Sequence, residues 1–114
     1  NAGNGVTCDN SGNVYVTGMY SGTLVIGTFT SVSSGMMDII TIKYDTSGNL
    51  LWIKCAGGTD DEQSYSVCTD YLGNCFITGY FRSQSLTIGT YTLTNTTTNS
   101  SQFFVAKYNS SPPA

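Results

Sequence analysis

The stretch that decides the fold is VTCDNSGNVYVTGMY (Val6–Tyr20), because the chain repeats it 61 residues later as VCTDYLGNCFITGYF (Val67–Phe81). Further along, LVIGTFT (residues 24–30) matches LTIGTYT (86–92) at a spacing of 62, and DIITIKYD (38–45) matches QFFVAKYN (102–109) at a spacing of 64. The spacing grows only between matched blocks, so the added residues fall in connecting segments. An internal repeat of this kind predicts two copies of one supersecondary unit.

Both copies consist of residues that favour strands. The runs Val14–Val16 and Phe103–Val105 are branched or aromatic throughout, and no segment has the apolar spacing of a long helix. Because these strands are apolar on both faces, we expect both faces to be covered, as in stacked sheets. The predicted strands are Val6–Cys8, Asn13–Met19, Asp38–Tyr44, Asn49–Cys55, Tyr65–Thr69, Asn74–Tyr80 and Phe103–Tyr108.

A long excursion separates the second predicted strand of each copy from the third. The excursions are residues 21–37 and 82–101, and each contains the pattern LxIGTxT, which predicts a small hairpin around Gly-Thr. We expect the apolar side of this hairpin to pack on the main sheet. Pairing of its edge with another chain is the alternative.

Four segments together resemble a known family: GNVYVTG (residues 12–18), IKYDTSGNLLW (42–52), AGG (56–58) and AKYN (106–109). They are similar to the bacterial-type β-propeller repeats called SBBP repeats, and the order of hairpins resembles NHL repeats. The resemblance covers nearly all of residues 2–109. It implies an all-β fold of two four-stranded antiparallel β-propeller-type blades, the second incomplete, each with an extra hairpin between strands two and three. It implies no catalytic residue, because the family has no single established activity.

The repeat also divides the chain. Residues 1–3 are assigned to the end of a preceding strand, 4–57 to unit one, 58–109 to unit two without its fourth strand, and 110–114 to a linker or tail. Both ends therefore resemble cuts from a longer array. Propellers use about 4–8 blades, so two blades alone leave apolar faces uncovered. We expect either further blades in the native chain or several copies in a ring or filament.

The sequence D-x-x-G-N occurs three times and allows two interpretations. A calcium loop needs about 6–8 oxygen ligands, but the copy at residues 70–74 has Tyr71 and Leu72 at its middle positions, whose side chains donate nothing useful. A type I turn with a glycine bulge needs only the aspartate and the glycine, which every copy keeps. We therefore favour structural turns at Asp9 and Gly12, Asp45 and Gly48, and Asp70 and Gly73.

Of the four other acids, Asp38 opens a predicted strand, and Asp60, Asp61 and Glu62 are consecutive in the segment that joins the units. In a four-stranded meander this segment lies at the same end as the excursions, and rigid scaffolds display function on such loops. We interpret the three acids as a solvated loop with ordinary pKa values. A weak metal site, or a site for a basic partner, is the alternative.

The composition excludes several classes of function. The chain has 114 residues, a net charge of −3 and no histidine, so it lacks the basic face of a nucleic-acid binder and any Ser-His-Asp or Cys-His arrangement. No apolar run is long enough to span a membrane. We predict no enzymatic activity and no cofactor.

Cysteine and asparagine positions give two further predictions. A bulge at Gly73 would place Cys68 opposite Phe76 and turn Cys75 to the other face, so we expect no disulfide and buried free thiols at all four cysteines: Cys8, Cys55, Cys68 and Cys75. Glycosylation sequons begin at Asn95, Asn99 and Asn109. In a chain rich in Asn, Ser and Thr, these are expected by chance as well.

Identical repeats, a neutral polar surface and two apolar faces favour a structural or assembly role, extracellular, at the cell surface, or on a particle such as a virion. The partners would be further blades or further copies. The alternative is a module that binds a glycan or a protein through its long loops. Aromatic platforms for a sugar would come from Tyr20, Trp52, Tyr80 and Phe81, although packing between blades also explains them.

Overall fold

The computed structural model describes residues 2–33, 36–58, 60–88, 91–95 and 100–109. None of the residues in these ranges forms a helix that could cross a membrane. They form eleven strands: β1 (Ala2–Cys8), β2 (Val14–Tyr20), β3 (Thr23–Ile26), β4 (Phe29–Val32), β5 (Asp38–Tyr44), β6 (Leu50–Ala56), β7 (Glu62–Thr69), β8 (Cys75–Phe81), β9 (Ser85–Ile88), β10 (Tyr91–Thr94) and β11 (Gln102–Tyr108).

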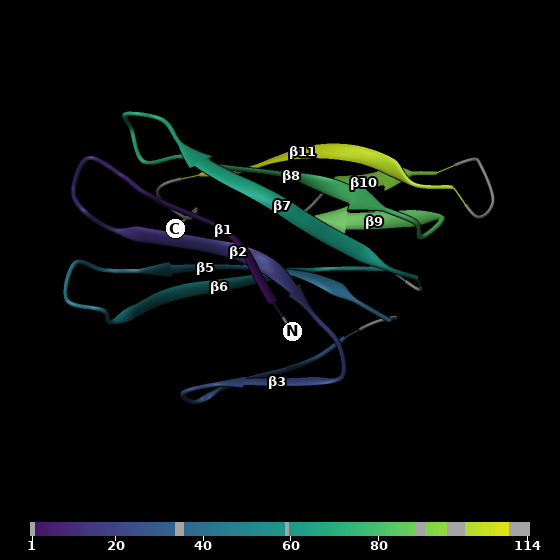
Figure 1. Ribbon diagram of the computed structural model, residues 1–114, viewed down its shortest axis with the longest axis horizontal. Coiled ribbons are helices and arrows are strands. Elements are labelled where there is room, and N and C mark those ends of the chain that lie inside the picture. The colour runs from purple at the N-terminus through teal and green to yellow at the C-terminus, as the bar shows by residue number, and fades with distance from the viewer. Residues whose placement is uncertain (1, 34–35, 59, 89–90, 96–99, 110–114) are drawn as a thin grey trace.

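The strands build two main sheets and two small hairpins, all antiparallel (Figure 1). The first sheet has the order β1-β2-β5-β6, and the second has the order β7-β8-β11. Strands β3 and β4 pair with each other, as do β9 and β10. The all-β prediction is therefore confirmed, and no sheet closes on itself within the described part of the chain.

Strands β1 and β7 begin earlier than the sequence predicted. Ala2 and Gly3, assigned from the repeat to a preceding strand, instead pair with Met19 and Gly18 of β2. Each of these two strands contains a bulge, between Gly3 and Gly5 in β1 and at residues 64–66 in β7, so the irregularity itself repeats. The bulge brings the backbones close: a Cβ at Gly18 would lie 2.0 Å from the carbonyl oxygen of Ala2.

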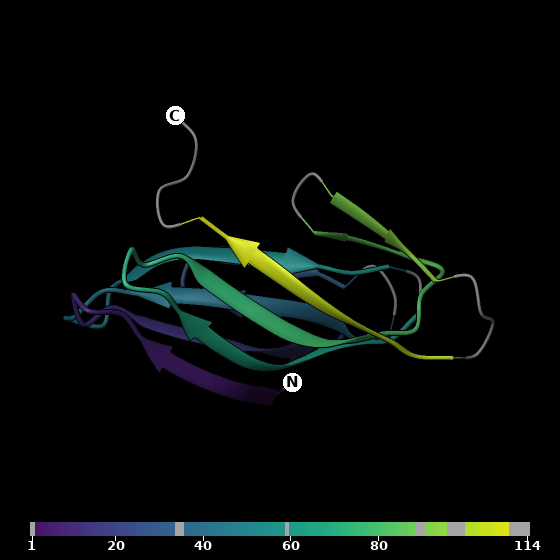
Figure 2. The ribbon, with the colours of Figure 1, turned by 90° about the horizontal axis from the view of Figure 1, so that it is seen from above.

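The two main sheets pack face to face, with β7 against β1, β2 and β5 (Figures 1 and 2). The core between them contains Tyr15 and Ile39 from the first sheet and Ile77, Phe81 and Phe104 from the second, all buried. We call the two surfaces that meet here the inner faces of the sheets, their contact the junction, and the opposite surfaces the outer faces. Burial of apolar area at the junction is the main favourable contribution to folding.

A short polar network lies inside this apolar junction. The hydroxyl oxygens of Thr17 and Ser64 are 2.6 Å apart and link the first sheet to the second. The Ser64 hydroxyl also donates to the carbonyl oxygen of Gly18 at 3.0 Å. Both side chains are fully buried, and burial of a hydroxyl is tolerated where it is hydrogen-bonded. The network therefore fixes how one sheet is placed on the other.

The two small hairpins cover apolar surface, as predicted. Leu24 and Ile26 of β3 pack against Tyr20 and Ile40 on the outer face of the first sheet. Leu86 and Ile88 of β9 belong to the core between the sheets. A bridge between Thr87 and Gly57 holds this second hairpin beside β6.

Candidate interaction surfaces

At one end of the molecule, the three D-x-x-G-N sequences form the same turn. The glycine amide donates to the aspartate carbonyl, and the glycine φ is 85° at Gly12, 86° at Gly48 and 82° at Gly73. One carboxylate oxygen accepts hydrogen bonds from the backbone amides two and four residues later, and the other accepts one from the asparagine side chain. These aspartates are Asp9, Asp45 and Asp70.

Hydrogen bonding lowers the pKa of all three turn aspartates. At Asp9, burial acts to raise the pKa, but the hydrogen bonds from Asn13 and Tyr15 outweigh it. At Asp45, the largest cause is the hydrogen bond from the backbone amide of its turn asparagine. At Asp70, it is the hydrogen bond from the side chain of that asparagine. The carboxylates are therefore held ionised by their own turns.

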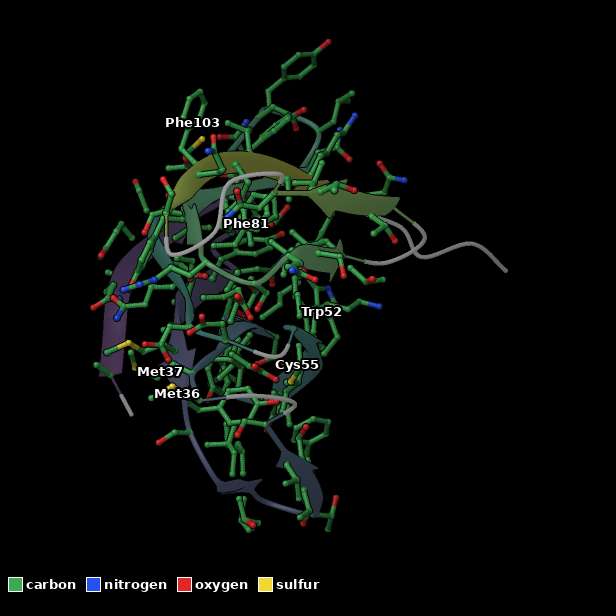
Figure 3. The ribbon with its side chains drawn as sticks, turned by 90° about the vertical axis from the view of Figure 1, so that its right-hand side faces the viewer. Met36, Met37, Trp52, Cys55, Phe81 and Phe103 are labelled. Carbon is green, nitrogen blue, oxygen red and sulfur yellow. The ribbon has the colours of Figure 1, made fainter. Side chains whose placement is uncertain are left out.

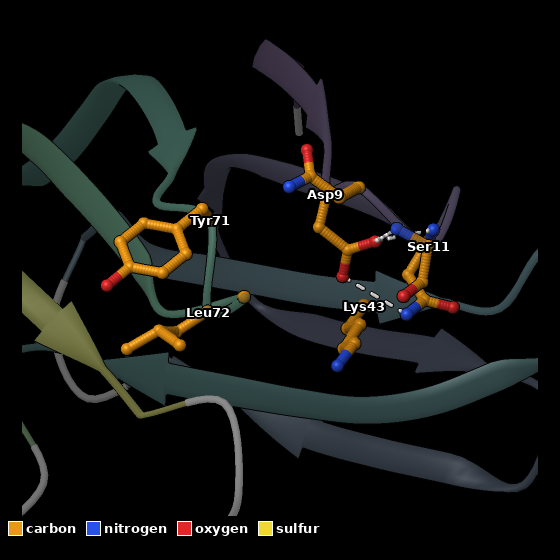
Figure 4. A pocket seen from close by; sticks show the side chains of 8 residues that line it. Asp9, Ser11, Lys43, Tyr71 and Leu72 are labelled. Carbon is orange, nitrogen blue, oxygen red and sulfur yellow. Dashed lines mark hydrogen bonds between the residues drawn. The ribbon is translucent and has the colours of Figure 1, made fainter.

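A polar pocket of about 250 Å³ opens where two of these turns meet (Figure 4). Asp9 and Lys43 line it from unit one, and Tyr71 lines it from unit two. Beneath it, the Tyr15 hydroxyl lies 2.9 Å from Asp9 Oδ2 and 3.2 Å from the carbonyl oxygen of Gly73. The Tyr15 hydroxyl therefore lies between the turn of unit one at Asp9 and the turn of unit two at Gly73, and both carboxylate oxygens of Asp9 already accept hydrogen bonds from the protein.

At the other end, the acidic segment departs from its prediction. Glu62 begins β7, and its side chain is 0% exposed. Its carboxylate accepts hydrogen bonds from the Gly58 amide at 2.7 Å and from the amide and hydroxyl of Ser83. Burial raises its pKa, although these hydrogen bonds act in the opposite direction. The interpretation of Glu62 as a solvated acid with an ordinary pKa is therefore wrong, because β7 starts at Glu62 and directs its side chain inward.

Asp60 and Asp61 extend the same connection. The Asp60 amide donates to Ser83 Oγ at 2.7 Å, and Asp61 Oδ1 accepts a hydrogen bond from the Met37 amide at 3.1 Å. The carbonyl oxygen of Asp61 also accepts one from the Arg82 amide. The segment thus joins the end of one excursion to the start of the other. Among the described residues, no three His, Cys, Asp or Glu side chains are grouped closely enough to hold a metal ion.

The four cysteines are free thiols, but only Cys75 is buried. Burial raises the pKa of the Cys75 thiol to about 12. The prediction of burial is wrong for Cys8, Cys55 and Cys68, which are exposed. Cys68 does lie opposite Phe76 in register, as predicted, and this places it on the outer face of β7. Cys8 and Cys55 lie on β1 and β6, the two edge strands of the first sheet.

The aromatic residues considered as sugar platforms lie mainly in the interior. Tyr20 and Phe81 are buried, and Trp52 is half-buried beside the core. Tyr80 stacks on the exposed ring of Tyr65, with ring centroids 5.8 Å apart. Packing within and between the sheets therefore accounts for most of this set.

The three sequons differ in their surroundings. Asn95 is buried, and its side-chain nitrogen, the atom that would carry a glycan, donates to the carbonyl oxygen of Ser100 at 2.7 Å. Asn109 is exposed. Asn99 lies outside the described residues.

The outer face of the second sheet presents an apolar surface. Phe103 is 82% exposed and Val105 is 66% exposed, and both project away from the first sheet (Figure 3 shows Phe103). Phe103 pairs in register with Tyr80, so the stacked Tyr65 and Tyr80 rings continue this surface onto β8 and β7. A shallow groove of about 130 Å³ beside Val105 is lined by residues of β7, β8 and β11.

The outer face of the first sheet is also apolar. A groove of about 240 Å³ runs over it, lined by Gly3, Val16 and Ile42 of the sheet and by the apolar side of the β3–β4 hairpin. Val6, which pairs in register with Val16, is 69% exposed at its margin. The β3–β4 hairpin already covers part of this face, where Tyr20 and Ile40 are buried.

Sequence reasoning predicted uncovered apolar faces but missed the buried Glu62. A usable signal was present in the glycines before it. A Cβ at Gly57 would lie 2.2 Å from the Asp38 carboxyl carbon, and a Cβ at Gly58 would lie 2.5 Å from Ser83. Two adjacent glycines beside an acidic run can thus indicate backbone packed against buried polar groups.

No family model matches the chain, and no match was found among curated proteins.

Proposed function

We propose that this chain is a non-catalytic, β-propeller-type repeat protein that acts as a structural scaffold outside the cell or at its surface. Its main sheets serve as blades, and the scaffold assembles by packing one sheet face on another. The resemblance of the repeats to SBBP sequences supports the blade interpretation, as does the meander order of the first sheet. A chain with only 10% charged residues supports the extracellular assignment.

The observation that carries this proposal is the outer face of the second sheet. Phe103, Val105 and the stacked tyrosines lie side by side on three neighbouring strands. A contiguous exposed apolar surface of this kind marks an interaction site. The carboxylates that could support catalysis are instead engaged in turns and in the junction.

Sedimentation velocity over a range of concentrations tests the proposal. We expect the average mass of the wild-type chain to rise with concentration. Phe103→Asp should shift the chain to the monomer, because a charge at this position must be desolvated in any packed interface. Tyr71→Asp is the matched control, since Tyr71 is 80% exposed but lies on a turn at the end of the molecule.

The Tyr71→Asp variant should associate like the wild type. A folded wild-type chain that stays monomeric at all concentrations would contradict the assembly function. Equal loss of association in both variants would show that net charge, and not the outer face, controls it.

A further inference from the structure

We infer that the outer face of the second sheet binds the outer face of the first sheet of a second copy, so that copies stack head to tail. This inference rests on the proposed assembly function and specifies its geometry. Its basis is the junction inside one chain, where the equivalent two surfaces already pack on each other.

The inner face of the first sheet forms one side of the junction. By the repeat, it corresponds to the outer face of the second sheet. The inner face of the first sheet contributes Tyr15, Thr17, Ile39 and Thr41, all buried. The residues at the matching repeat positions are Phe76, Thr78, Phe103 and Val105. Ile39 is 0% exposed, whereas Phe103 is 82% exposed. The outer face of the second sheet thus repeats a surface that the chain buries elsewhere.

The inner face of the second sheet forms the other side of the junction. By the repeat, it corresponds to the outer face of the first sheet. The inner face of the second sheet contributes Ser64, Val67, Ile77, Phe81 and Phe104. The matching residues of unit one are Gly3, Val6, Val16, Tyr20 and Ile40. Four of these five residues line the groove on the outer face of the first sheet, and the fifth, Val6, pairs in register with Val16, which lines it. The hairpin β3–β4 on this face corresponds to β9–β10 in the junction.

The contact of a lysine with an aromatic ring also occurs both in the junction and on the outer face of the second sheet. In the junction, Lys43 Nζ lies 5.2 Å from the centre of the Tyr15 ring. At the matching positions, Lys107 Nζ lies 5.8 Å from the centre of the Phe76 ring. The cation on the outer face of the second sheet is therefore already positioned as it is in the junction, against an aromatic ring.

The contact between copies has a register that follows from the junction. Thr17 contacts Ser64 across the junction, and these positions correspond to Thr78 and Gly3. Thr78 of one copy should therefore lie against Gly3 of the next. A side chain at Gly3 is sterically acceptable, because the nearest atom to its Cβ would be Val16 Cγ1 at 3.7 Å.

One contact of the junction is absent from this stacking. Trp52 of β6 packs against Tyr15 and Tyr108, with ring centroids 6.1 and 5.8 Å apart. The second sheet has three strands in the described part of the chain, so no strand there corresponds to β6. The contact between copies is thus smaller than the junction, and we expect reversible, concentration-dependent stacking.

Disulfide cross-linking tests the register. The background carries Cys8→Ser, Cys55→Ser, Cys68→Ser and Cys75→Ala, and the test variant adds Gly3→Cys and Thr78→Cys. After mild oxidation, non-reducing electrophoresis should show a ladder of covalent oligomers. Each single-cysteine variant should lose the ladder. The control adds Thr17→Cys and Ser64→Cys to the same background and should close a disulfide within one chain, which verifies that the background folds with its junction formed.

The outcomes separate the inference from the function on which it rests. A covalent dimer from Thr78→Cys alone would mean that two second sheets face each other, which overturns head-to-tail stacking but keeps assembly. Association in sedimentation without a ladder, while the control disulfide closes, would place the contact elsewhere and overturn the inference. A wild-type chain that never associates overturns the proposed function itself.

Discussion

Carboxylates have opposite roles at the two ends of the molecule. At the turn end, Asp9, Asp45 and Asp70 accept hydrogen bonds from their own pentapeptides, and the pKa of each is lowered. At the other end, Glu62 is buried between the connecting segment at Gly58 and the start of the second excursion at Ser83, and its pKa is raised. The carboxylates of the turns are therefore stabilised in their ionised form near water, whereas folding removes the carboxylate of Glu62 from water.

The turns depend on local sequence, whereas the hydrogen bonds of Glu62 depend on tertiary structure. Each turn is specified by five consecutive residues, and it can form before the sheets meet. The carboxylate of Glu62 instead joins Gly58 to Ser83, which lies 21 residues after Glu62, so its hydrogen bonds to Ser83 exist only when β7 and β8 are folded together. Loss of a turn should weaken one hairpin, and loss of Glu62 should weaken the attachment of the connecting segment to the start of the second excursion.

Removal of the buried carboxylate is the strongest test of this contrast. Glu62→Ala leaves the Gly58 amide and the Ser83 amide and hydroxyl without their acceptor. We expect a loss of about 2–4 kcal/mol in the free energy of unfolding, since each buried donor left unpaired costs about 1–3 kcal/mol and some rearrangement is available. Urea denaturation followed by tryptophan fluorescence measures it, because Trp52 lies beside the core.

Glu62→Gln is the matched variant, because it keeps one acceptor oxygen in nearly the same volume. It should lose less stability than Glu62→Ala. Equal stability of Glu62→Ala and wild type would mean that the hydrogen bonds of the carboxylate to Gly58 and Ser83 do not stabilise the fold.

The second test concerns the turn aspartate that also accepts a hydrogen bond from a core side chain. Asp9 accepts a hydrogen bond from the Tyr15 hydroxyl, which Asp45 in the otherwise identical turn does not. A double-mutant cycle with Asp9→Ala and Tyr15→Phe should give a coupling of about 1–2 kcal/mol, because hydrogen bonds to charged groups are worth about 1.5–3 kcal/mol at most. The measurement is the free energy of unfolding of the four proteins.

A matched cycle with Asp45→Ala in place of Asp9→Ala serves as the control and should show no coupling to Tyr15→Phe. Coupling of similar size in both cycles would indicate that the Tyr15 substitution disturbs the core and does not report the hydrogen bond.

The third test isolates the turn backbone. Gly48 has a φ of 86°, and a Cβ there would meet no atom within 4 Å. Gly48→Ala should therefore lower the free energy of unfolding by about 1–2 kcal/mol, because a residue with a Cβ is strained in the left-handed conformation. Thermal unfolding should show a smaller loss for Gly48→Asn, since asparagine tolerates this conformation better than alanine. A Gly48→Ala variant as stable as wild type would mean that the turn changes type at little cost.

The parts of this structure that sequence could predict are those encoded locally and twice. The register that separates Cys68 from Cys75 and the small hairpins followed from alternation, turn residues and the repeat. Prediction failed at the starts of β1 and β7, and the same irregularity lies beside both starts. A bulge follows Gly3 in β1 and Ser64 in β7, and alternation with a period of two does not extend across a bulge.

The error at the start of β7 led to the error at Glu62. A strand that begins at Tyr65 leaves the three acids before it in a loop. The observed strand starts three residues earlier and places Glu62 and Ser64 on its inner face. The contact of Ser64 with Thr17 had no local signal at all, because it depends on how two sheets stack.

The smallest expected effect is the pH dependence of stability, in which the two ends should act with opposite sign. The folded chain holds the Glu62 proton more tightly than the unfolded chain does, because burial raises this pKa above its ordinary 4.5. That stabilisation is complete below pH 4.5 and is lost as the pH rises through the raised pKa. Asp45 has a pKa below its ordinary 3.8, so its contribution is present above pH 3.8 and is lost as the pH falls through the lowered pKa.

Urea denaturation of wild type, Glu62→Gln and Asp45→Asn between about pH 7 and pH 3 measures both contributions, because each variant removes one titrating group. On acidification from neutral pH, the stability of wild type relative to Glu62→Gln should increase. Below about pH 4, the stability of wild type relative to Asp45→Asn should decrease. If the stability difference between wild type and Glu62→Gln were independent of pH, Glu62 would have the same pKa in the folded and unfolded chains. Burial would then not distinguish Glu62 from the solvated turn aspartates.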